Sequence, residues 1–147
     1  MNNVITKPVE ILLIEDNMGD VRLTQEAFKD SKILNHINFV RDGIEAIAYL
    51  KREGQYKDAL RPDIILLDLD LPKKTGYEVL GEIKKDENLK RMPVIVLTVS
   101  KGEHDIIKTY DLHANCFITK PLSVDKFFSI VRTIEDFWLS IVKLPSK

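Results

Sequence analysis

Five polar side chains in this sequence have the chemistry needed to hold a metal ion and receive a phosphoryl group. Glu15 and Asp16 form an acidic pair, Asp68 is a third carboxylate, and Thr98 and Lys120 add a hydroxyl and a cation. Mg²⁺ prefers oxygen ligands, and an aspartate can act as a nucleophile that forms an aspartyl phosphate. A hydroxyl and an ammonium group can each bind a phosphoryl oxygen. Together these groups favour Mg²⁺-dependent transfer of a phosphoryl group onto an aspartate.

All five residues stand at, or just beyond, the end of a short apolar run. These runs, which are typical of buried strands in a parallel sheet, cover residues 11–14, 64–67, 93–97 and 116–118, and an edge-like run covers 37–40. Ligands of open α/β sheets bind at the carboxyl ends of the strands, near the switch in strand order. Because neighbouring strands lie about 4.8 Å apart, Asp16 and Asp68 can share one cation if their strands are adjacent.

Amphipathic segments with helix-start signals separate the apolar runs. A helix is expected from about Asp20, a second has Asp42 as its N-cap, and a third begins behind a capping box at Thr75. In the second helix, Ile44, Ile47 and Ala48 are expected to face the core. Further helices are expected near residues 106–110 and over about 123–142.

Five strands that alternate with five helices predict an α/β fold of the flavodoxin-like, doubly wound type. Right-handed crossovers place helices on both faces of the parallel sheet, and the expected strand order is 2-1-3-4-5. A chain of 147 residues suits one core, so we expect a single domain over residues 9–142, between tails at 1–8 and 143–147. Its last helix, at about 123–142, is extended beyond what is needed to cover the sheet once.

The overall composition excludes several classes of protein. The 22 basic and 23 acidic residues give a net charge of −1, whereas dedicated nucleic-acid binders have a strong basic excess. No apolar stretch approaches the roughly 20 residues that span a membrane, and the N-terminus has no signal-peptide core. Cys116 is the only cysteine, which favours a reducing, cytoplasmic setting. We therefore expect neither a nucleic acid nor a membrane as a partner.

Four motifs, taken in order, resemble those of the response regulator receiver family. They are the acidic pair in LLIEDN, the aspartate in IILLDLDLP, the hydroxyl in VLTVS and the lysine in ITKP. An acidic residue at a strand end is usually just a solvated loop residue, but four such motifs in order, each closing a strand, are specific. The resemblance covers about residues 9–135. It implies a signalling protein, not an enzyme, which receives a phosphoryl group from a histidine kinase and assists its own phosphorylation and dephosphorylation.

The resemblance also implies a role for each residue of the acidic site. Asp68 would be the phosphoacceptor, and Asp16 would bind Mg²⁺ directly. Glu15 stands where many members of the family have Asp, so it would bind the metal either directly or through a water molecule. Asp70, two residues after the acceptor, would offer its backbone carbonyl to the metal.

Three further residues would respond to the phosphoryl group. Lys120 would pair with it, and Thr98 would be the switch hydroxyl. Phe117, three residues before Lys120, matches the aromatic that changes rotamer together with Thr98; the alternative is a packing aromatic without a switch role. The output would be a phosphorylation-driven change of surface, read by an unidentified downstream protein without a separate output domain.

Two longer segments resemble a narrower group of receivers. The segment REGQYKDALRPDIILLDLDLP and the tail IEDFWLSIVKLP are similar to stand-alone regulators that partner phytochrome-type histidine kinases. The resemblance implies a sensor histidine kinase of this type as the partner. It leaves open whether that kinase senses light.

Apolar residues on the expected last helix form two stripes. One stripe can face the sheet. The other has alternating steps of three and four, as in a coiled-coil seam, and consists of Phe127, Ile130, Ile134, Phe137 and Ile141. In a monomer it would leave aromatic side chains in water. We expect a homodimer built on this stripe; the alternative is a tail that folds back on its own domain.

Two other functions are compatible with parts of the pattern. The sequence Asp68-Leu69-Asp70 has the form of the nucleophile motif of haloacid-dehalogenase-type phosphatases. In those enzymes the motif normally follows the first strand, whereas here it follows the third, and an acidic pair precedes it. The second alternative is a pseudo-receiver that binds partners without phosphorylation, against which the complete set of acids, Thr and Lys argues.

Overall fold

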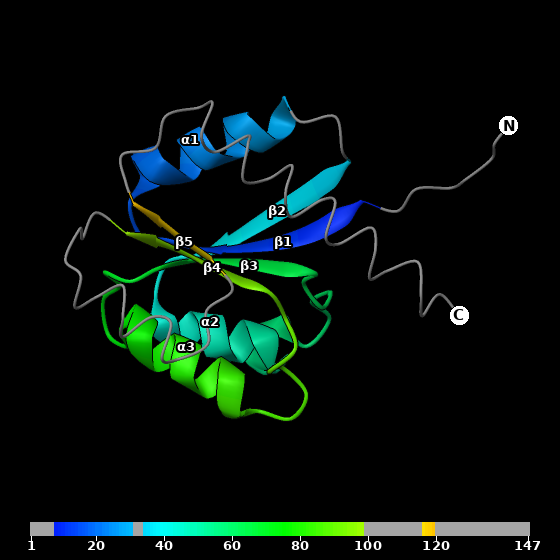
Figure 1. Cartoon of the computed structure of the whole chain (residues 1–147). Coiled ribbons are helices and arrows are strands. Elements are labelled where there is room, and N and C mark those ends of the chain that lie inside the picture. Colours follow the sequence, from blue (N-terminus) through cyan, green and yellow to red (C-terminus); the bar gives the residue numbers. More distant parts are fainter. Residues whose placement is uncertain (1–7, 31–33, 99–115, 120–147) are drawn as a thin grey trace, which may run out of the picture.

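The protein folds around a five-stranded parallel sheet (Figure 1). The computed structural model describes residues 8–30, 34–98 and 116–119. Its strands lie in the order β2-β1-β3-β4-β5, which confirms the predicted order and the flavodoxin-like fold. The strands are β1 (Val9–Ile14), β2 (Asn35–Val40), β3 (Ile64–Asp68), β4 (Val94–Thr98) and β5 (Cys116–Thr119).

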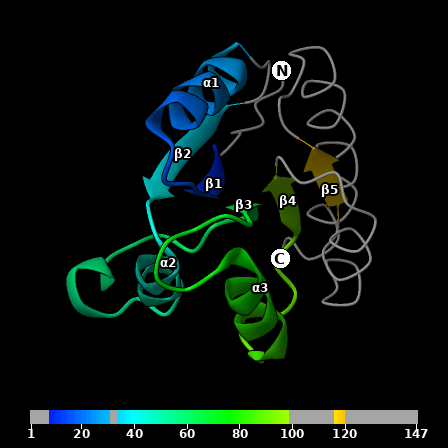
Figure 2. The ribbon, with the colours of Figure 1, turned by 90° about the vertical axis from the view of Figure 1, so that its left-hand side faces the viewer.

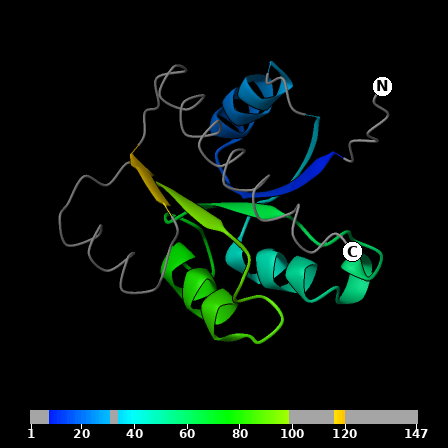
Figure 3. The ribbon, with the colours of Figure 1, turned by 45° about the vertical axis from the view of Figure 1, so that its right-hand side comes forward.

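Helices cover both faces of this sheet, as expected for a doubly wound fold. The described helices are α1 (Met18–Lys29), α2 (Gly43–Leu50), α3 (Gly76–Lys85) and the short 3-10 helix η1 (Gly54–Tyr56). Helix α1 lies on one face, whereas α2 and α3 lie side by side on the opposite face (Figure 3). Figure 2 shows the molecule from the left-hand side of Figure 1, with β2 at one edge of the sheet and β5 at the other.

Successive residues of the central strands pack on opposite helical layers, because strand side chains point alternately to the two faces. Toward α2 and α3, the three central strands contribute the buried residues Leu12, Ile14, Ile65, Leu67, Val94 and Val96. Toward α1, they contribute Ile11, Leu13, Ile64, Leu66, Ile95 and Leu97. All five residues of β3 are buried, as expected for a central parallel strand. A polar residue at the end of such a strand is therefore anchored in the core.

Helix α1 begins slightly earlier than the sequence predicts. The apolar pattern places its start near Asp20, whereas the helix begins at Met18, behind Asn17. The side-chain oxygen of Asn17 accepts a hydrogen bond from the N–H of Asp20 at 3.0 Å, which is the contact of an N-cap. This cap follows directly on the acidic pair and fixes the direction of the chain as it leaves β1.

Helix α2 is capped as predicted, but of the residues expected to face the core only Ile47 is buried. Oδ1 of Asp42 accepts a hydrogen bond from the N–H of Glu45 at 2.8 Å. The prediction that Ile44 faces inward is wrong, since this residue is 56% exposed. The buried face consists of Ala46, Ile47, Tyr49 and Leu50. At about 100° per residue, position 44 lies nearly opposite the centre of that face.

Helix α3 begins with the predicted capping box. The N–H of Glu78 donates to Oγ1 of Thr75 at 3.2 Å, and the N–H of Thr75 donates to Oε1 of Glu78 at 2.8 Å. The capping box thus satisfies two backbone donors at this end of the helix. The buried residues of α3 are Gly76, Val79, Leu80 and Ile83.

The polar segment at residues 55–62 has no sequence pattern that predicts a helix or a strand. An aromatic side chain holds the start of this segment in place. The ring of Tyr56 lies 5.2 Å from the ring of Tyr49, measured between centroids. The Tyr56 hydroxyl donates to Oε1 of Glu45 at 2.8 Å. Burial, together with this bond to a carboxylate, raises the pKa of Tyr56 to about 12. Tyr56 therefore fastens the loop to α2.

Two predicted helices, near residues 106–110 and at about 123–142, lie outside the described residues, as does the stripe at 127–141. Their existence, the domain bounds at 9 and 142 and the tails remain predictions. None of the helices in the described part of the chain is long and apolar enough to cross a membrane.

Candidate metal and phosphoacceptor site

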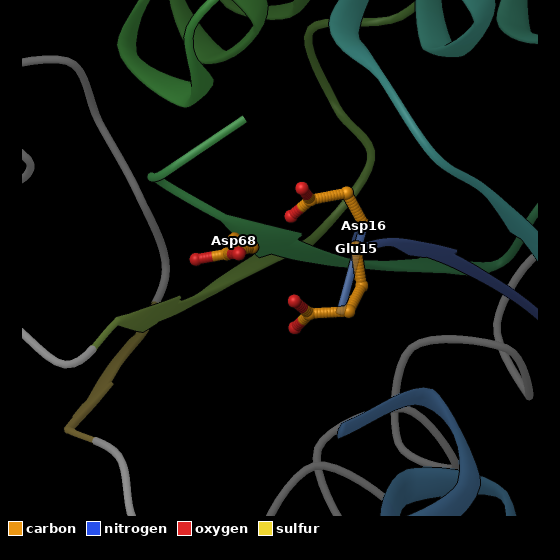
Figure 4. Close-up of side chains that lie close together, drawn as sticks. All are labelled: Glu15, Asp16 and Asp68. Carbon is orange, nitrogen blue, oxygen red and sulfur yellow. The ribbon is translucent and has the colours of Figure 1, made fainter. Parts of the chain in front are cut away.

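Three carboxylates meet at the carboxyl ends of β1 and β3 (Figure 4). One oxygen from each of Glu15, Asp16 and Asp68 lies within 4.8 Å of the other two. Glu15 and Asp68 are buried, and Asp16 is partly exposed. The structure thus brings together the three acidic side chains that the sequence analysis assigned to a metal site.

The strand register explains why these residues meet. Ile14 of β1 pairs with Leu67 of β3, so Glu15 and Asp68 occupy neighbouring ends of adjacent strands. The N–H of Glu15 donates to a carbonyl at the end of β2 at 3.0 Å, which continues the β1–β2 ladder by one residue. Alternation then sends Glu15 toward the α1 side of the sheet and Asp16 toward the α2–α3 side. Figure 4 shows their carboxylates on either side of that of Asp68.

Backbone N–H groups from the adjoining loops bind two of the carboxylates. The N–H of Asn17 donates to Oε2 of Glu15 at 3.3 Å, and the N–H of Asp70 donates to Oδ1 of Asp68 at 3.2 Å. The Asp70 side chain is exposed and does not belong to the acidic cluster of the described residues. This placement is compatible with the prediction that Asp70 offers its backbone carbonyl to a metal.

Gly76, the first residue of α3, lies against the backbone of Asp68 and Leu69. An ideal Cβ on Gly76 would lie 2.4 Å from the carbonyl oxygen of Asp68 and 2.5 Å from the Cα of Leu69. The N–H of Gly76 also donates to the carbonyl of Leu69 at 3.1 Å. Sequence reasoning missed this role, because it treated the glycine only as part of the capping box. A glycine directly after the capping Thr75 was the available signal.

The remaining site residues lie on strands β4 and β5 or beyond them. Thr98 ends β4, which is the neighbour of β3, and it pairs with Thr119 on β5. Phe117 also lies on β5; of both Thr98 and Phe117, the structure describes the backbone. Lys120 follows β5 and lies outside the described residues. The switch roles of Thr98 and Phe117 and the phosphoryl-binding role of Lys120 therefore stay predictions.

The carboxylate cluster fits a hard divalent cation. Oxygens within 4.8 Å of one another can approach a common point. Ionised carboxylates at that distance repel by about 3 kcal/mol per pair at an effective dielectric constant of about 20, and a bound cation relieves this repulsion. Mg²⁺ and Mn²⁺ both take oxygen ligands, and Mg²⁺ usually keeps several waters, which a phosphoryl oxygen can replace. The donor set therefore supports a divalent metal site.

Comparison with known proteins agrees with this architecture. A family model described as the response regulator receiver domain matches residues 11–132. The chain belongs to the response regulator receiver family. The matched part of this receiver domain includes all four motifs that carry the resemblance in sequence.

Individual relatives match nearly the whole receiver domain. This chain is 48% identical to the response regulator Rcp1 of Synechocystis sp. over 146 residues, which are 99% of each chain. The solved structure of the phosphorylated cyanobacterial phytochrome response regulator RcpA is 55% identical, with a TM-score of 0.81, and the match covers 92% of this chain and 96% of that one. The Mn²⁺-bound form of Rcp1 is 50% identical, with a TM-score of 0.80, over 90% and 95% of the two chains.

Membership of this family sets aside the phosphatase alternative. The sequence Asp68-Leu69-Asp70 begins at the end of β3, and the matched receiver model spans it. The acidic pair at Glu15 and Asp16 precedes it, directly after β1, where a phosphatase of the haloacid-dehalogenase type would normally have its nucleophile. The order of motifs along the chain is therefore that of a receiver.

Proposed function

We propose that this receiver domain accepts a phosphoryl group from a sensor histidine kinase onto Asp68, with Mg²⁺ bound at the acidic cluster. The observation that supports this is the buried Asp68 carboxylate, which lies within 4.8 Å of oxygens of Glu15 and Asp16. The N–H of Asp70 also binds this carboxylate and fixes its direction. These contacts favour Asp68 as the acceptor over the exposed Asp70.

The proposed reaction moves one phosphoryl group between two side chains. An oxygen of Asp68 attacks the phosphorus of a phosphohistidine, and the bond between phosphorus and the imidazole nitrogen breaks. The imidazole leaves with the electron pair of that bond, and Asp68 becomes an aspartyl phosphate. When bound, Mg²⁺ neutralises charge on the phosphoryl oxygens. The receiver domain contributes by holding the acceptor oxygen beside the metal position before the donor arrives.

Four groups would hold the metal. Asp16 and Asp68 would each contribute a carboxylate oxygen, and Asp70 would contribute its backbone carbonyl. Glu15 would bind directly or through a water molecule, and its extra methylene relative to Asp favours the water. An ion held in this way keeps a coordination position for the phosphoryl group.

We propose that residues on β4 and β5, and one that follows β5, respond to phosphorylation. A phosphoryl group adds about −1.5 to −2 charges, so new partners for its oxygens must stabilise the changed state. Lys120 would pair with it, and the Thr98 hydroxyl would donate to it. Phe117 would change rotamer as Thr98 moves. The resulting surface is the proposed signal to a downstream protein.

The proposed partner is a sensor histidine kinase of the phytochrome type, in a cytoplasmic setting. The similarity to RcpA and Rcp1 supports this choice. We also propose a homodimer built on the apolar stripe at residues 127–141, within a single domain of residues 9–142. The dimer would place two copies of the surface that changes on phosphorylation in one assembly.

Transfer from such a kinase tests the proposal. A phytochrome-type histidine kinase is first autophosphorylated with labelled ATP and freed of nucleotide, then mixed with this protein and Mg²⁺. We expect the label to move to the receiver as an acyl phosphate that hydroxylamine removes, and to stay on the kinase when Asp68→Asn is used. Label on the Asp68→Asn variant would contradict the acceptor assignment. Absence of transfer to the wild type from several such kinases would contradict the proposed partner.

A further inference from the structure

The turn between β2 and α2, with the first residue of α2, contacts the segments of chain that follow β1 and β3. Its residues are Arg41 and Asp42, and Gly43 begins α2. A guanidinium nitrogen of Arg41 lies 3.4 Å from the carbonyl oxygen of Asp16. Gly43 lies against Lys74, and an ideal Cβ on the glycine would be 2.2 Å from the Lys74 carbonyl oxygen. The turn therefore contacts the loops that carry the acidic pair and follow the acceptor.

The carboxylate of Asp42 divides its two oxygens between a helix and a loop. Oδ1 accepts the N–H of Glu45 at 2.8 Å, which is the N-cap bond of α2. Oδ2 lies 3.4 Å from Nζ of Lys73, in the loop between β3 and α3. The Asp42 side chain is 10% exposed, whereas that of Lys73 is 63% exposed. A nearly buried carboxylate is thus matched by a lysine that reaches it from the solvent side.

The backbone of Lys73 has an unusual conformation. Its φ is 68°, in the left-handed region that residues other than glycine, asparagine and aspartate rarely adopt. Glycine would adopt this conformation without strain. A lysine at this position therefore calls for a compensating contact, and the ion pair with Asp42 supplies one.

The loop that contains Lys73 is the one that touches the acceptor. Three residues before Lys73, the N–H of Asp70 donates to Oδ1 of Asp68. Three residues after it, Gly76 packs on the Asp68 backbone. The conformation of Lys73 thus determines how the chain runs between two contacts with Asp68.

We propose that Asp42 is a positioning residue for the acceptor site, which acts through Lys73 to hold the loop that presents Asp70 to Asp68 and to the metal. This inference rests on the proposed function of the acidic cluster. It assigns a role in metal binding and phosphoryl transfer to a side chain outside the acidic cluster of the described residues. Helix α2 is the rigid element to which the loop is tied.

Two substitutions separate the ion pair from the helix cap. Asp42→Asn keeps a good N-cap, because Asn and Asp cap equally well, and removes the charge. Lys73→Met removes the ammonium group and keeps most of the side-chain length. Each is expected to weaken divalent metal binding by about two- to fivefold, the range of partly exposed ion pairs, and the double variant should lose no more than either single one. Lys73→Arg should retain the wild-type affinity.

Titration of the full chain with Mn²⁺, with free Mn²⁺ followed by electron paramagnetic resonance, tests this coupling. The matched control is the exposed pair of Glu87 and Lys90, 3.1 Å apart in the turn that follows α3. Glu87→Gln, Lys90→Met and their double variant should bind Mn²⁺ as the wild type does. Urea unfolding of every variant separates a loss of affinity from a loss of fold.

The outcomes separate the inference from the function on which it rests. Equal losses in Asp42→Asn, Lys73→Met and their double variant, with Lys73→Arg unchanged, would support the positioning role. Additive losses, or unchanged affinity in folded variants, would overturn it while leaving the acidic cluster intact. A wild-type chain that binds no Mn²⁺ would overturn the proposed metal site itself, and the inference with it.

Discussion

Gly76 lies so close to the carbonyl of Asp68 that any side chain at position 76 would overlap this carbonyl. An ideal Cβ at this position would lie 2.4 Å from the Asp68 carbonyl oxygen. The start of α3 is therefore in backbone contact with Asp68, and the capping box at Thr75 fixes that start. A change at Gly76 must move either the helix or Asp68.

Gly76→Ala should accordingly harm both stability and phosphorylation. The added methyl forces a backbone shift, so we expect the free energy of unfolding to fall by about 1–3 kcal/mol, the usual cost of overpacking. We also expect slower phosphorylation by acetyl phosphate, because Asp68 is displaced from the acidic cluster. Urea unfolding and the rate of mass increase measure the two effects.

Gly81→Ala is the matched control on the same helix. An ideal Cβ on Gly81 meets no atom within 4 Å, so the alanine fits without strain. A glycine inside a helix costs roughly 0.5–1 kcal/mol relative to alanine, and we expect a gain of that size with unchanged phosphorylation. If both alanine variants were equally stable and equally active, the close contact of Gly76 would have no consequence.

Asp16→Asn should change how strongly metal stabilises the protein. Without metal, the substitution removes one of three mutually repelling carboxylates, so the variant should be at least as stable as the wild type. With Mg²⁺ at about 100 times its Kd, the wild type should gain about 2.7 kcal/mol, and the variant far less. Thermal unfolding in chelator and in Mg²⁺ measures both. An equal gain in the two proteins would show that Asp16 is not a ligand.

Tyr56→Phe should cost stability at neutral pH and less at high pH. The folded-state pKa of Tyr56 is raised from 10.0 to about 12, so its contribution is complete below pH 10.0 and is lost as the pH rises through about 12. Loss of the bond to Glu45 should lower the free energy of unfolding by about 1–2 kcal/mol near pH 8. Urea unfolding near pH 8 and near pH 12 compares the two proteins. A difference that did not shrink at the higher pH would contradict this account.

The proposed dimer has its own test. We expect light scattering at micromolar concentration to give twice the mass of one chain. Ile134→Asp would place a charge in the apolar stripe at 127–141 and should give the mass of a monomer. A monomeric wild type would refute the dimer and favour a tail that folds back on its own domain.

Much of the fold and of the acidic site could be predicted from sequence, because both depend on local patterns. The fully apolar run before Asp68 indicated a central strand, and this strand lies between β1 and β4. The capping pattern at Thr75 indicated the start of a helix, which begins there. Once the strand order was assumed, the carboxyl ends of the strands brought Glu15, Asp16 and Asp68 together.

What could not be predicted depends on contacts between distant segments. Asn17 caps α1 only because the chain turns as it leaves β1, and the steric role of Gly76 requires α3 to pack beneath Asp68. Ile44 was assigned to the core because it lies one helical turn before Ile47, whereas tertiary packing centres the buried face of α2 nearer Ala46 and Leu50. The contact between Asp42 and Lys73 joins two loops whose proximity is a property of the folded sheet.

Intact mass after incubation with Mg²⁺ and acetyl phosphate tests the central claim most directly, beside Asp68→Asn and a sample with chelator. The account predicts that the wild type gains one phosphoryl group only in the presence of Mg²⁺, and that Asp68→Asn gains none. A phosphoryl group on the Asp68→Asn variant would contradict Asp68 as the acceptor. A wild type that gains no phosphoryl group, and forms no complex with fluoroberyllate, would identify a pseudo-receiver.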